Sequence, residues 1–280
     1  MNFSNANQLK GWLRNKTIQT GAPANTLLQN YMMERFLERV SVSRYRENFI
    51  LKGGFLITAL VGVDKRSTMD IDATIKSLPI DRIRIEKIVR ELIALDVGDQ
   101  VSFEITGINS IHEINGYDDF RIGLKATLFT VRVPLKIDLT VGDTVIPREI
   151  EYPYQLMFED RTIPLMAYNV ITILAEKIEG ILTRNVSNTR ARDFYDVYLL
   201  LTLNKDIVSK CELSEALRIK ANERGSLGVI ENADRYLKMI TESPDLARIW
   251  KNYSKRYPYA NGITFAEVCS ALQQVLGNQK

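Results

Sequence analysis

The pattern of hydrophobic residues changes near residue 160, and this change limits the folds open to the chain. Before it, segments that alternate apolar and polar side chains, as half-buried strands do, are mixed with amphipathic helices. Beyond Pro164 the segments with helical patterns are 169–183, 193–203, 213–222 and 265–276. The sequence therefore predicts an α/β (α+β) fold, with a mixed-sheet domain over residues 1–160 and a helical C-terminal domain over residues 161–280.

The first domain is expected to contain both helices and strands. From residue 25, apolar side chains recur at every fourth position and predict an amphipathic helix. A second helix of this kind is expected after the capping residue Asp81. A short strand ends at Gly53-Gly54 and leads into a buried helix. The predicted strands are 48–52, 69–76 and a consecutive, antiparallel set over 101–108, 120–130 and 131–141.

The scarcity of histidine restricts the chemistry open to this chain, because His112 is the only one. Zinc hydrolases, Ser-His-Asp hydrolases and two-His-one-carboxylate iron enzymes all need more, and His112 is expected to be structural. Cys211 and Cys269 are far apart in helical segments, so we expect two reduced core residues rather than a disulfide or a metal site. Any catalysis must use carboxylates, lysines and hydroxyls, and oxygen ligands suit Mg²⁺ or Mn²⁺.

Nothing in the sequence predicts a membrane segment. The longest apolar runs, such as 55–61 and 197–203, are far shorter than the roughly 20 residues of a membrane span. The polar N-terminus lacks the basic start and apolar stretch of a secretory signal. We therefore expect a cytoplasmic protein without a membrane partner.

Two basic clusters are candidates for contact with RNA, although the net charge of +3 alone decides nothing. Arg184, Arg190 and Arg192 form the first cluster. Residues 250–259 form the second and interleave basic with aromatic side chains, as an RNA-facing surface would. For the second cluster taken by itself, the favoured alternative is a solvated loop and a helix whose aromatic rings pack inward.

The segment Asp70-Ile71-Asp72 is the main candidate for catalysis. Two carboxylates at positions i and i+2 of a strand project from the same face, while Ile71 turns into the core. A pair of Mg²⁺ ions held there could bridge a triphosphate and activate an attacking hydroxyl. An Asp-x-Asp pair that simply faces solvent is the alternative.

Two further features support a catalytic reading of these acids. Gly53-Gly54 separates a strand from a helix, so its backbone N–H groups could close on phosphate oxygens, unless it is only a tight turn. Asp138 lies between Ile137 and Leu139 on a predicted strand and should point away from both. It is therefore either a surface side chain or a third acid of the site.

In this order, the strand, the glycine pair and the three acids resemble the polymerase-beta-like nucleotidyltransferase superfamily. More specifically, the chain resembles the AbiEii family of nucleotidyltransferase toxins, over about residues 48–200 with a looser match beyond. The segments that carry the resemblance are Leu51-Lys52-Gly53-Gly54, Arg66-Ser67-Thr68-Met69-Asp70-Ile71-Asp72, Leu174-Ala175-Glu176-Lys177 and Arg192-Asp193-Phe194-Tyr195-Asp196. One departure is Phe55, which stands where the family's glycine motif has serine or threonine.

The resemblance implies an NTP-dependent toxin of a bacterial toxin–antitoxin pair, linked with phage defence, whose relatives add nucleotides to the 3′ end of tRNA. It assigns metal binding to Asp70, Asp72 and Asp138, and essential roles in the helical domain to Lys177 and Asp193. The residues expected to bind NTP are Gly53, Gly54, Arg66, Ser67 and Lys177. The resemblance also implies a separately encoded antitoxin, which we expect to act without a stable complex.

Each assignment has a structural alternative. Lys177, which the functional reading places on an NTP phosphate across an interdomain cleft, could form a surface pair with Glu176. Asp193 could orient Lys177 or Arg192 by an ion pair, or could stabilise the start of a helix. Arg66, Ser67 and Thr68 could hydrogen-bond phosphate or simply end a loop.

Two other functions remain open at this point. The same core supports nucleotidyl transfer to a small molecule or to a protein hydroxyl. A module that binds NTP but has lost turnover is also conceivable, because Phe55 alters the glycine motif.

Overall fold

The computed structural model describes residues 3–66, 68–78, 81–114, 117–204 and 208–277, and for residues 112–118 it describes no side chains. The chain divides into two compact units. The first, here called the sheet unit, comprises Met1–Asp143 and Glu149–Tyr168. The second, the helical unit, comprises Thr144–Arg148 and Asn169–Lys280.

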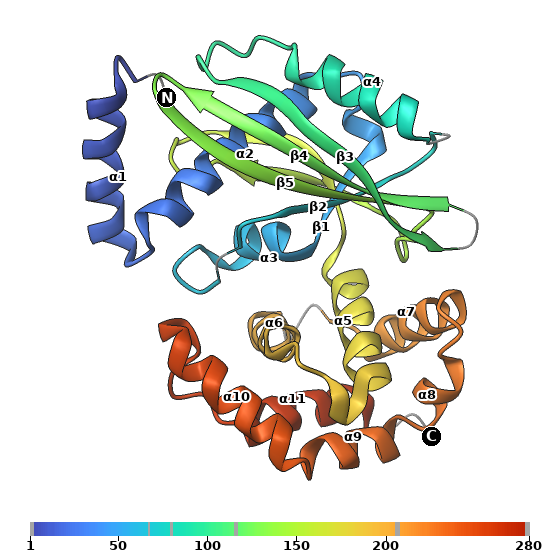
Figure 1. Ribbon diagram of the computed structural model, residues 1–280. Coiled ribbons are helices and arrows are strands. Elements are labelled where there is room, and N and C mark those ends of the chain that lie inside the picture. Colours follow the sequence, from blue (N-terminus) through green and yellow to red (C-terminus); the bar gives the residue numbers. More distant parts are fainter. Residues whose placement is uncertain (1–2, 67, 79–80, 115–116, 205–207, 278–280) are drawn as a thin grey trace. The chain divides into compact units, whose positions relative to one another are not determined.

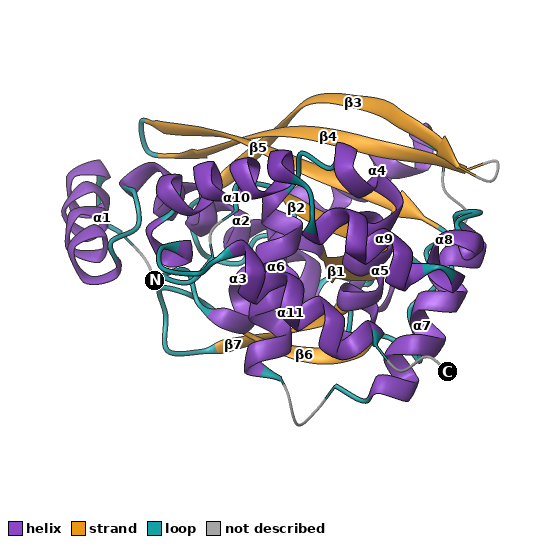
Figure 2. Ribbon diagram, turned by 90° about the horizontal axis from the view of Figure 1, so that it is seen from below, coloured by secondary structure: helices purple, strands orange, loops and turns teal. Residues whose placement is uncertain are grey.

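The sheet unit is built on one mixed sheet of seven strands, in the order β3-β4-β5-β2-β1-β7-β6 (Figure 1). The pairs β2–β5 and β1–β7 are parallel, and the remaining neighbours are antiparallel. The strands are β1 Phe49–Lys52, β2 Ile71–Ile75, β3 Ser102–Ile114, β4 Tyr117–Leu128, β5 Val131–Val141, β6 Ile150–Gln155 and β7 Thr162–Ala167. The predicted mixed sheet and the antiparallel set formed by β3, β4 and β5 are confirmed, and these are the long neighbouring strands in Figure 2.

Four helices accompany this sheet: α1 Ala6–Thr20, α2 Ala24–Val42, α3 Gly53–Val61 and α4 Arg82–Ile93, with a 3₁₀ turn at Arg46–Asn48. Helix α2 packs against β5 and β7, and α4 lies along β3 (Figure 1). The predicted cap of α4 is confirmed, because the Asp81 carboxylate accepts a hydrogen bond from the Arg84 backbone N–H. The sequence did not predict α1 or the β6–β7 hairpin.

Strand β5 shows how the sheet separates core from site. Its odd-numbered side chains from Val133 to Leu139 are buried, whereas the even-numbered residues between them are more exposed. Successive side chains of a strand point to opposite faces. Asp138 therefore lies on the face opposite Ile137 and Leu139, as predicted.

The helical unit contains α5 Val170–Arg184, α6 Ala191–Leu203, α7 Lys210–Glu223, α8 Leu227–Glu231, α9 Ala233–Thr241, α10 Pro244–Arg256 and α11 Phe265–Leu276. Two 3₁₀ turns, Asn185–Ser187 and Pro258–Ala260, join them. The predicted helices correspond to α5, α6, α7 and α11 (Figures 1 and 2). Helix α11 begins with a capping box, in which the Thr264 and Glu267 side chains accept hydrogen bonds from each other's backbone N–H groups.

The expectation for the two cysteines is half wrong. Both are free and helical, and Cys269 is buried in α11, but Cys211 is exposed. Cys211 lies in the first turn of α7, whose buried face begins at Leu213 and continues through Ala216 and Leu217. The helical period therefore turns Cys211 away from the core.

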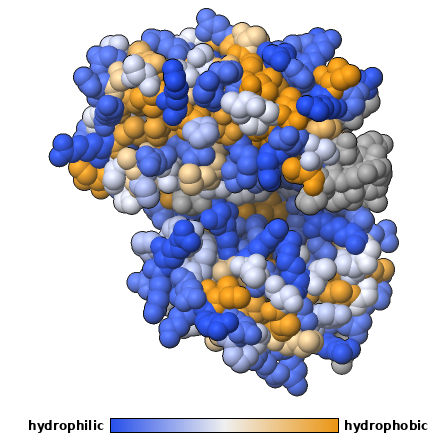
Figure 3. Space-filling view, viewed as in Figure 1, coloured by the Kyte–Doolittle hydropathy of each residue, from blue (hydrophilic) through white to orange (hydrophobic). Residues whose placement is uncertain are grey.

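Among the helices of the described residues, none combines the length and the apolar character needed to cross a membrane. On the face drawn in Figure 3, hydrophobic surface occurs as patches among hydrophilic side chains.

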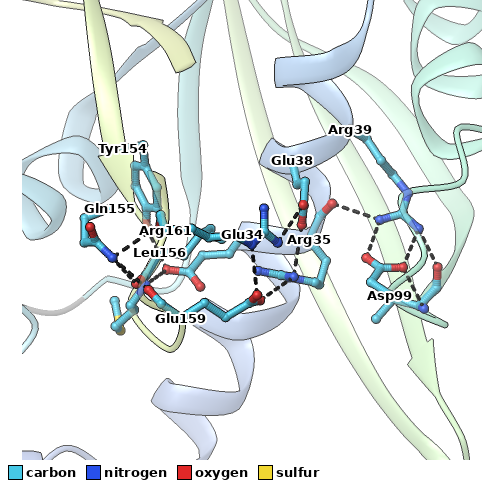
Figure 4. A network of polar contacts seen from close by, with 12 residues as sticks. Glu34, Arg35, Glu38, Arg39, Asp99, Tyr154, Gln155, Leu156, Glu159 and Arg161 are labelled. Atoms are coloured by element: carbon cyan, nitrogen blue, oxygen red, sulfur yellow. Dashed lines mark hydrogen bonds and ion pairs between the residues drawn. The ribbon is translucent and has the colours of Figure 1, made fainter. Parts of the chain in front are cut away.

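Helix α2 is buried on its polar face as well as its apolar one. Arg35 forms ion pairs with Glu38 at 3.0 Å and with Glu159 at 2.8 Å, and Arg39 pairs with Asp99 at 2.6 Å (Figure 4). Glu34 is fully buried beside them. Its Oε1 accepts hydrogen bonds from the Tyr154 hydroxyl at 3.1 Å and from the Met157 backbone N–H at 2.7 Å. This network fastens α2 to the β6–β7 hairpin and to the segment before β3.

The pKa of Glu34 should make the stability of the fold depend on pH. Burial, only partly offset by its hydrogen bonds and by Arg35, raises the pKa of Glu34 to about 8. A carboxyl whose pKa is higher in the folded than in the unfolded chain favours folding at low pH, and this contribution is lost as pH rises from about 4.5 to about 8.

Glu34→Gln should remove this loss, because glutamine keeps the Oε1 acceptor and cannot ionise. Urea unfolding at pH 5 and pH 8.5 should then show the variant gaining stability over wild type by a few kcal/mol at the higher pH. Glu86→Gln, on the exposed face of α4, is the control. The same pH dependence in wild type and Glu34→Gln would contradict the assignment.

Candidate active site

The three predicted carboxylates come together on one face of the sheet. Asp72 on β2 is the direct register partner of Asp138 on the parallel neighbour β5. Asp70 precedes Asp72 by two residues, and its carboxylate lies 3.0 Å from the Lys136 ammonium, two residues before Asp138. Adjacent strands are about 4.8 Å apart, so Asp72 and Asp138 are close neighbours. The Asp-x-Asp pair and the third acid, separated by 66 residues, therefore belong to one cluster.

Cationic side chains surround this acidic face. Arg121 on β4 is the register partner of Asp138 and donates two hydrogen bonds to its carboxylate, both of 2.9 Å. Lys52 at the end of β1 is the register partner of Asp72 and donates a hydrogen bond of 2.7 Å to the Thr140 hydroxyl. Lys52 also forms an ion pair with Asp143. A bidentate arginine and two lysines thus balance much of the acidic charge.

The environment of Asp72 disfavours its charged form. Burial raises its pKa, and the negative charges of Asp138 and Asp70 add to this effect, while Lys52 and the Gly54 backbone N–H oppose it. A cation beside Asp72 would remove that penalty. The donors available are all carboxylate oxygens, which are the ligands preferred by Mg²⁺ and Mn²⁺.

The residues therefore fit a hard divalent cation in chemistry and in strand register. Within the described part of the chain, however, no three His, Cys, Asp or Glu side chains are arranged as a ready metal site. Asp70 and Asp138 are instead directed to Lys136 and Arg121.

The predicted glycine turn lies directly beside Asp72. Gly53 begins α3 with a φ of +67°, and the Gly54 backbone N–H approaches Asp72 Oδ2 at 3.4 Å. A β-carbon on Gly53 would overlap the Asp72 carboxylate. A β-carbon on Gly54 would lie 2.7 Å from Arg66 Nη2 and 2.9 Å from Thr68 Oγ1. Both glycines are therefore required by close approach, and Gly53 also by its backbone conformation.

Of the remaining residues that were predicted to contact phosphate or to end a loop, the structure describes some and not others. Arg66 and Thr68 are buried against the glycine turn, whereas Ser67 lies outside the described residues. Phe55 is a core residue whose ring stacks on Tyr154 with a centroid distance of 5.8 Å. The departure from the family's glycine motif thus fills the core beneath the turn.

Gly53→Ala should lower nucleotidyl transfer by about a hundredfold or more, because its methyl group would displace Asp72. Gly21→Ala is a matched control for backbone strain, since Gly21 has a φ of +71° but no atom within 4 Å of where its β-carbon would lie. Both variants should lose comparable stability from the positive φ. Equal activities of the two variants would show that the contact with Asp72 is unimportant.

Lys177 and Asp193, the two predicted residues of the helical unit, form an ion pair. The Lys177 ammonium on α5 lies 2.7 Å from Asp193 Oδ1 and 2.9 Å from Asp196 Oδ2, both on α6. Although burial disfavours its charged form, Asp196 and Asp193 raise the pKa of Lys177 above its usual value. Lys177 is therefore a charged, oriented ammonium. The alternative pairing with Glu176 is wrong, because Glu176 lies beside Lys220 and Arg224.

Several residues of these clusters were given no role by sequence reasoning. Lys52 stands inside the quoted glycine motif, but only the β1–β2 register places it opposite Asp72. Arg121 and Lys136 are two of the basic residues on strongly patterned strands, and nothing local marks them as partners of the acids. Asp196 was noted only as lying three residues after Asp193, and its burial explains why Lys177 is held so firmly.

Comparison with known proteins agrees with this geometry. The family model of the nucleotidyl transferase AbiEii toxin, type IV toxin–antitoxin system, matches residues 35–274, so the chain belongs to the AbiEii family. It is therefore a nucleotidyltransferase of the toxin class. Members of the nucleotidyltransferase family generally use an NTP and a divalent metal. A cognate antitoxin follows from the same membership. No curated protein sequence matches the chain significantly.

Two solved structures share the fold. MenT4, a nucleotidyltransferase toxin from Mycobacterium tuberculosis, is 14% identical with a TM-score of 0.53, and the match covers 95% of this chain and 97% of that one. A protein from H. pylori that has been proposed to be a nucleotidyltransferase is 13% identical with a TM-score of 0.51, covering 91% of this chain and 96% of that one. At such identities the likeness supports the fold alone.

Proposed function

We propose that the protein transfers a nucleoside monophosphate from an NTP to the 3′ end of tRNA in a Mg²⁺-dependent reaction. The observation that supports this most directly is the strand register that sets Asp72 beside Asp138, with Asp70 on the same face and a glycine turn against Asp72. Oxygen ligands beside backbone N–H groups suit a metal-bound triphosphate.

In the proposed reaction, the 3′ hydroxyl attacks the α-phosphate, a new P–O bond forms and pyrophosphate leaves. Asp70, Asp72 and Asp138 would hold Mg²⁺ or Mn²⁺, and the metal would supply charge stabilisation at the phosphates when bound. The residues that we assign to the NTP phosphates are Gly53, Gly54, Arg66, Ser67 and Lys177. Arg121, which binds Asp138, and Lys52, which lies opposite Asp72, would orient the acidic face.

Lys177 and Asp193 are proposed to take part in the same reaction from the helical part of the chain. Their ion pair supports this assignment, because Asp193 and Asp196 fix the ammonium in one position. An oriented cation stabilises charge that develops on a transferring phosphoryl group. The sequence predicted a sheet domain over 1–160 and a helical domain over 161–280, and the main segment of the helical unit begins at Asn169. We propose that this helical part contributes to the active site.

As a type IV toxin, the protein would be neutralised without a stable complex, and we propose that its antitoxin lowers its expression or modifies it. We further propose that the toxin acts in the cytoplasm as part of abortive phage infection.

The acceptor can be tested by incubating the protein and Mg²⁺ with each α-labelled NTP and total tRNA. Label should appear in tRNA, and it should be lost when the 3′ terminal diol is first oxidised with periodate or when EDTA is added. Label in the protein or in a small molecule would instead support the alternative acceptors. Binding of NTP without any transfer would indicate a module that has lost turnover.

A further inference from the structure

A basic pocket of about 460 Å³ lies within the helical unit. It is lined by residues 189–193, at the start of α6, and by side chains from residues 249–257, at the end of α10. This volume is sufficient for one nucleotide-sized group. The pocket unites the two basic clusters of the sequence, which are separated by about 60 residues along the chain.

Three arginines give the pocket its charge: Arg190, Arg192 and Arg256. In the described part of the chain, none of them forms an ion pair with a carboxylate. Asp193 is the acidic residue of the lining, and its carboxylate is already engaged by Lys177 at 2.7 Å, with Arg184 at 3.8 Å. The pocket therefore carries a net positive charge that a ligand can neutralise.

Tyr257 orients two of these arginines without neutralising them. The guanidinium carbons of Arg192 and Arg256 lie over its ring, 5.9 Å and 5.6 Å from the centroid. Tyr257 is itself held by Tyr253, at 4.8 Å between ring centroids, and by Tyr259, which is stacked at 5.3 Å with an interplanar angle of 21°. Arg192 Nη2 also donates a long hydrogen bond of 3.5 Å to the Tyr257 hydroxyl. A cation–π contact itself leaves the remaining N–H donors of a guanidinium able to bind an anion.

The predicted inward packing of the aromatic rings is therefore confirmed for only part of the second cluster. Trp250 and Tyr253 are buried, while Tyr257 is half-buried and faces the pocket. The last turns of α10 thus combine an aromatic core with a basic surface.

The cations come from two separate segments of the lining. Arg190 and Arg192 lie at the start of α6, and Arg256 lies at the end of α10. Cations contributed by both segments suit successive phosphates of one chain. Guanidinium planes additionally provide stacking surfaces for bases, which a carboxylate-rich peptide would not use.

We propose that this pocket binds the single-stranded 3′ segment of the RNA acceptor, with Arg190, Arg192 and Arg256 on its phosphates and Tyr257 as the positioning residue. The inference rests on the proposed transfer to RNA and identifies residues that would bind the acceptor. It assigns the second basic cluster a role that is separate from the carboxylates of the sheet unit.

The test measures binding of a fluorescent single-stranded RNA oligonucleotide to the full chain, without NTP, over a range of salt concentrations. Arg256→Gln should weaken binding about fivefold or more and reduce the slope of log K against log salt by about 0.7, the value for one lost phosphate contact on a single strand. Tyr257→Leu should weaken binding by a similar factor, because both guanidiniums lose their support. Tyr257→Phe keeps the ring and removes only the long hydrogen bond from Arg192, so it should remain within about twofold of wild type.

Arg248→Gln is the matched control, because Arg248 is an exposed arginine of the same helix that pairs with Asp245 and does not line the pocket. It should change neither affinity nor slope, and NTP binding should be unaffected in every variant. The proposal is overturned by absent RNA binding in wild type, by equal effects of Arg256→Gln and Arg248→Gln, or by an equal loss of NTP binding. Displacement of RNA by polyglutamate at the concentration at which RNA itself competes would also overturn it.

Failure of this proposal can be distinguished from failure of the proposed reaction. If no NTP labels tRNA but Arg256→Gln still weakens RNA binding, the reaction is wrong and the pocket assignment holds. If tRNA is labelled and Arg256→Gln leaves both RNA binding and the KM for tRNA unchanged, only the pocket assignment is wrong.

Discussion

Asp72→Asn should lower nucleotidyl transfer by at least about a hundredfold, with little loss of folded protein. Asparagine has nearly the same shape, so the packing against the glycine turn should persist, but it lacks the charge that a metal ion requires. Removing one preorganised electrostatic group from an active site commonly costs about 10² to 10³ in rate. Burial raises the pKa of Asp72, so the neutral asparagine should also be tolerated better than the carboxylate in the metal-free fold.

The matched control for this variant is Asp160→Asn, which alters an exposed aspartate away from the acidic face. Initial rates of label transfer should be compared at saturating NTP, and urea unfolding should confirm that both proteins are folded. If Asp72→Asn retains the activity of Asp160→Asn, the acidic face is not the catalytic centre.

Lys177→Met should damage both stability and activity. The substitution leaves the fully buried Asp196 and the largely buried Asp193 without their ammonium partner. Removing one member of a buried ion pair typically costs about 3–5 kcal/mol, because the other member keeps its charge and loses its main counter-charge. Urea unfolding at pH 7 should show a loss of this size, and transfer should fall at least about a hundredfold.

A double variant separates the two effects. Lys177→Met with Asp196→Asn removes the buried carboxylate charge together with its cation, so it should recover much of the stability without recovering transfer. Recovery of both would mean that Lys177 acts only by holding α5 against α6. Full stability of the single Lys177→Met variant would contradict the ion-pair geometry.

The sheet unit could be anticipated from sequence where the apolar pattern was periodic and local. Strands β3, β4 and β5 follow alternating or β-branched segments, and α4 has both an amphipathic pattern and a capping aspartate. The β6–β7 hairpin was not predicted, because each strand is only six residues long and each contains a proline. Helix α1 was not predicted because only Leu9 and Leu13 of its residues are buried.

Helix α2 shows what the local pattern cannot reveal. Its apolar face was predicted, but Glu34, Arg35 and Arg39, which are polar residues of the same helix, are buried as well. Their partners, such as Asp99 and Glu159, come from segments 60 or more residues away. The free-energy cost of burying these charges is offset only by partners that are distant in the sequence. A local pattern does not reveal such partners.

In the candidate site, too, local features were predicted from the sequence and pairings between distant segments were not. Spacing alone placed Asp70 and Asp72 on one face of a strand, and the alternation around Asp138 gave its direction. The pairing of Asp72 with Asp138, and of each acid with Lys52, Arg121 or Lys136, required the order of strands in the sheet. Lys177 and Asp193 were identified through the family resemblance, and their ion pair with Asp196 is a finding of the structure.

The most direct test of nucleotidyl transfer compares α-labelled with γ-labelled NTP, in parallel reactions with wild type, tRNA and Mg²⁺. The proposed reaction predicts that the α-label enters tRNA while the γ-label is released as pyrophosphate. Transfer of the γ-label to any acceptor, with the α-label remaining in a nucleoside diphosphate, would contradict it and indicate phosphoryl transfer instead.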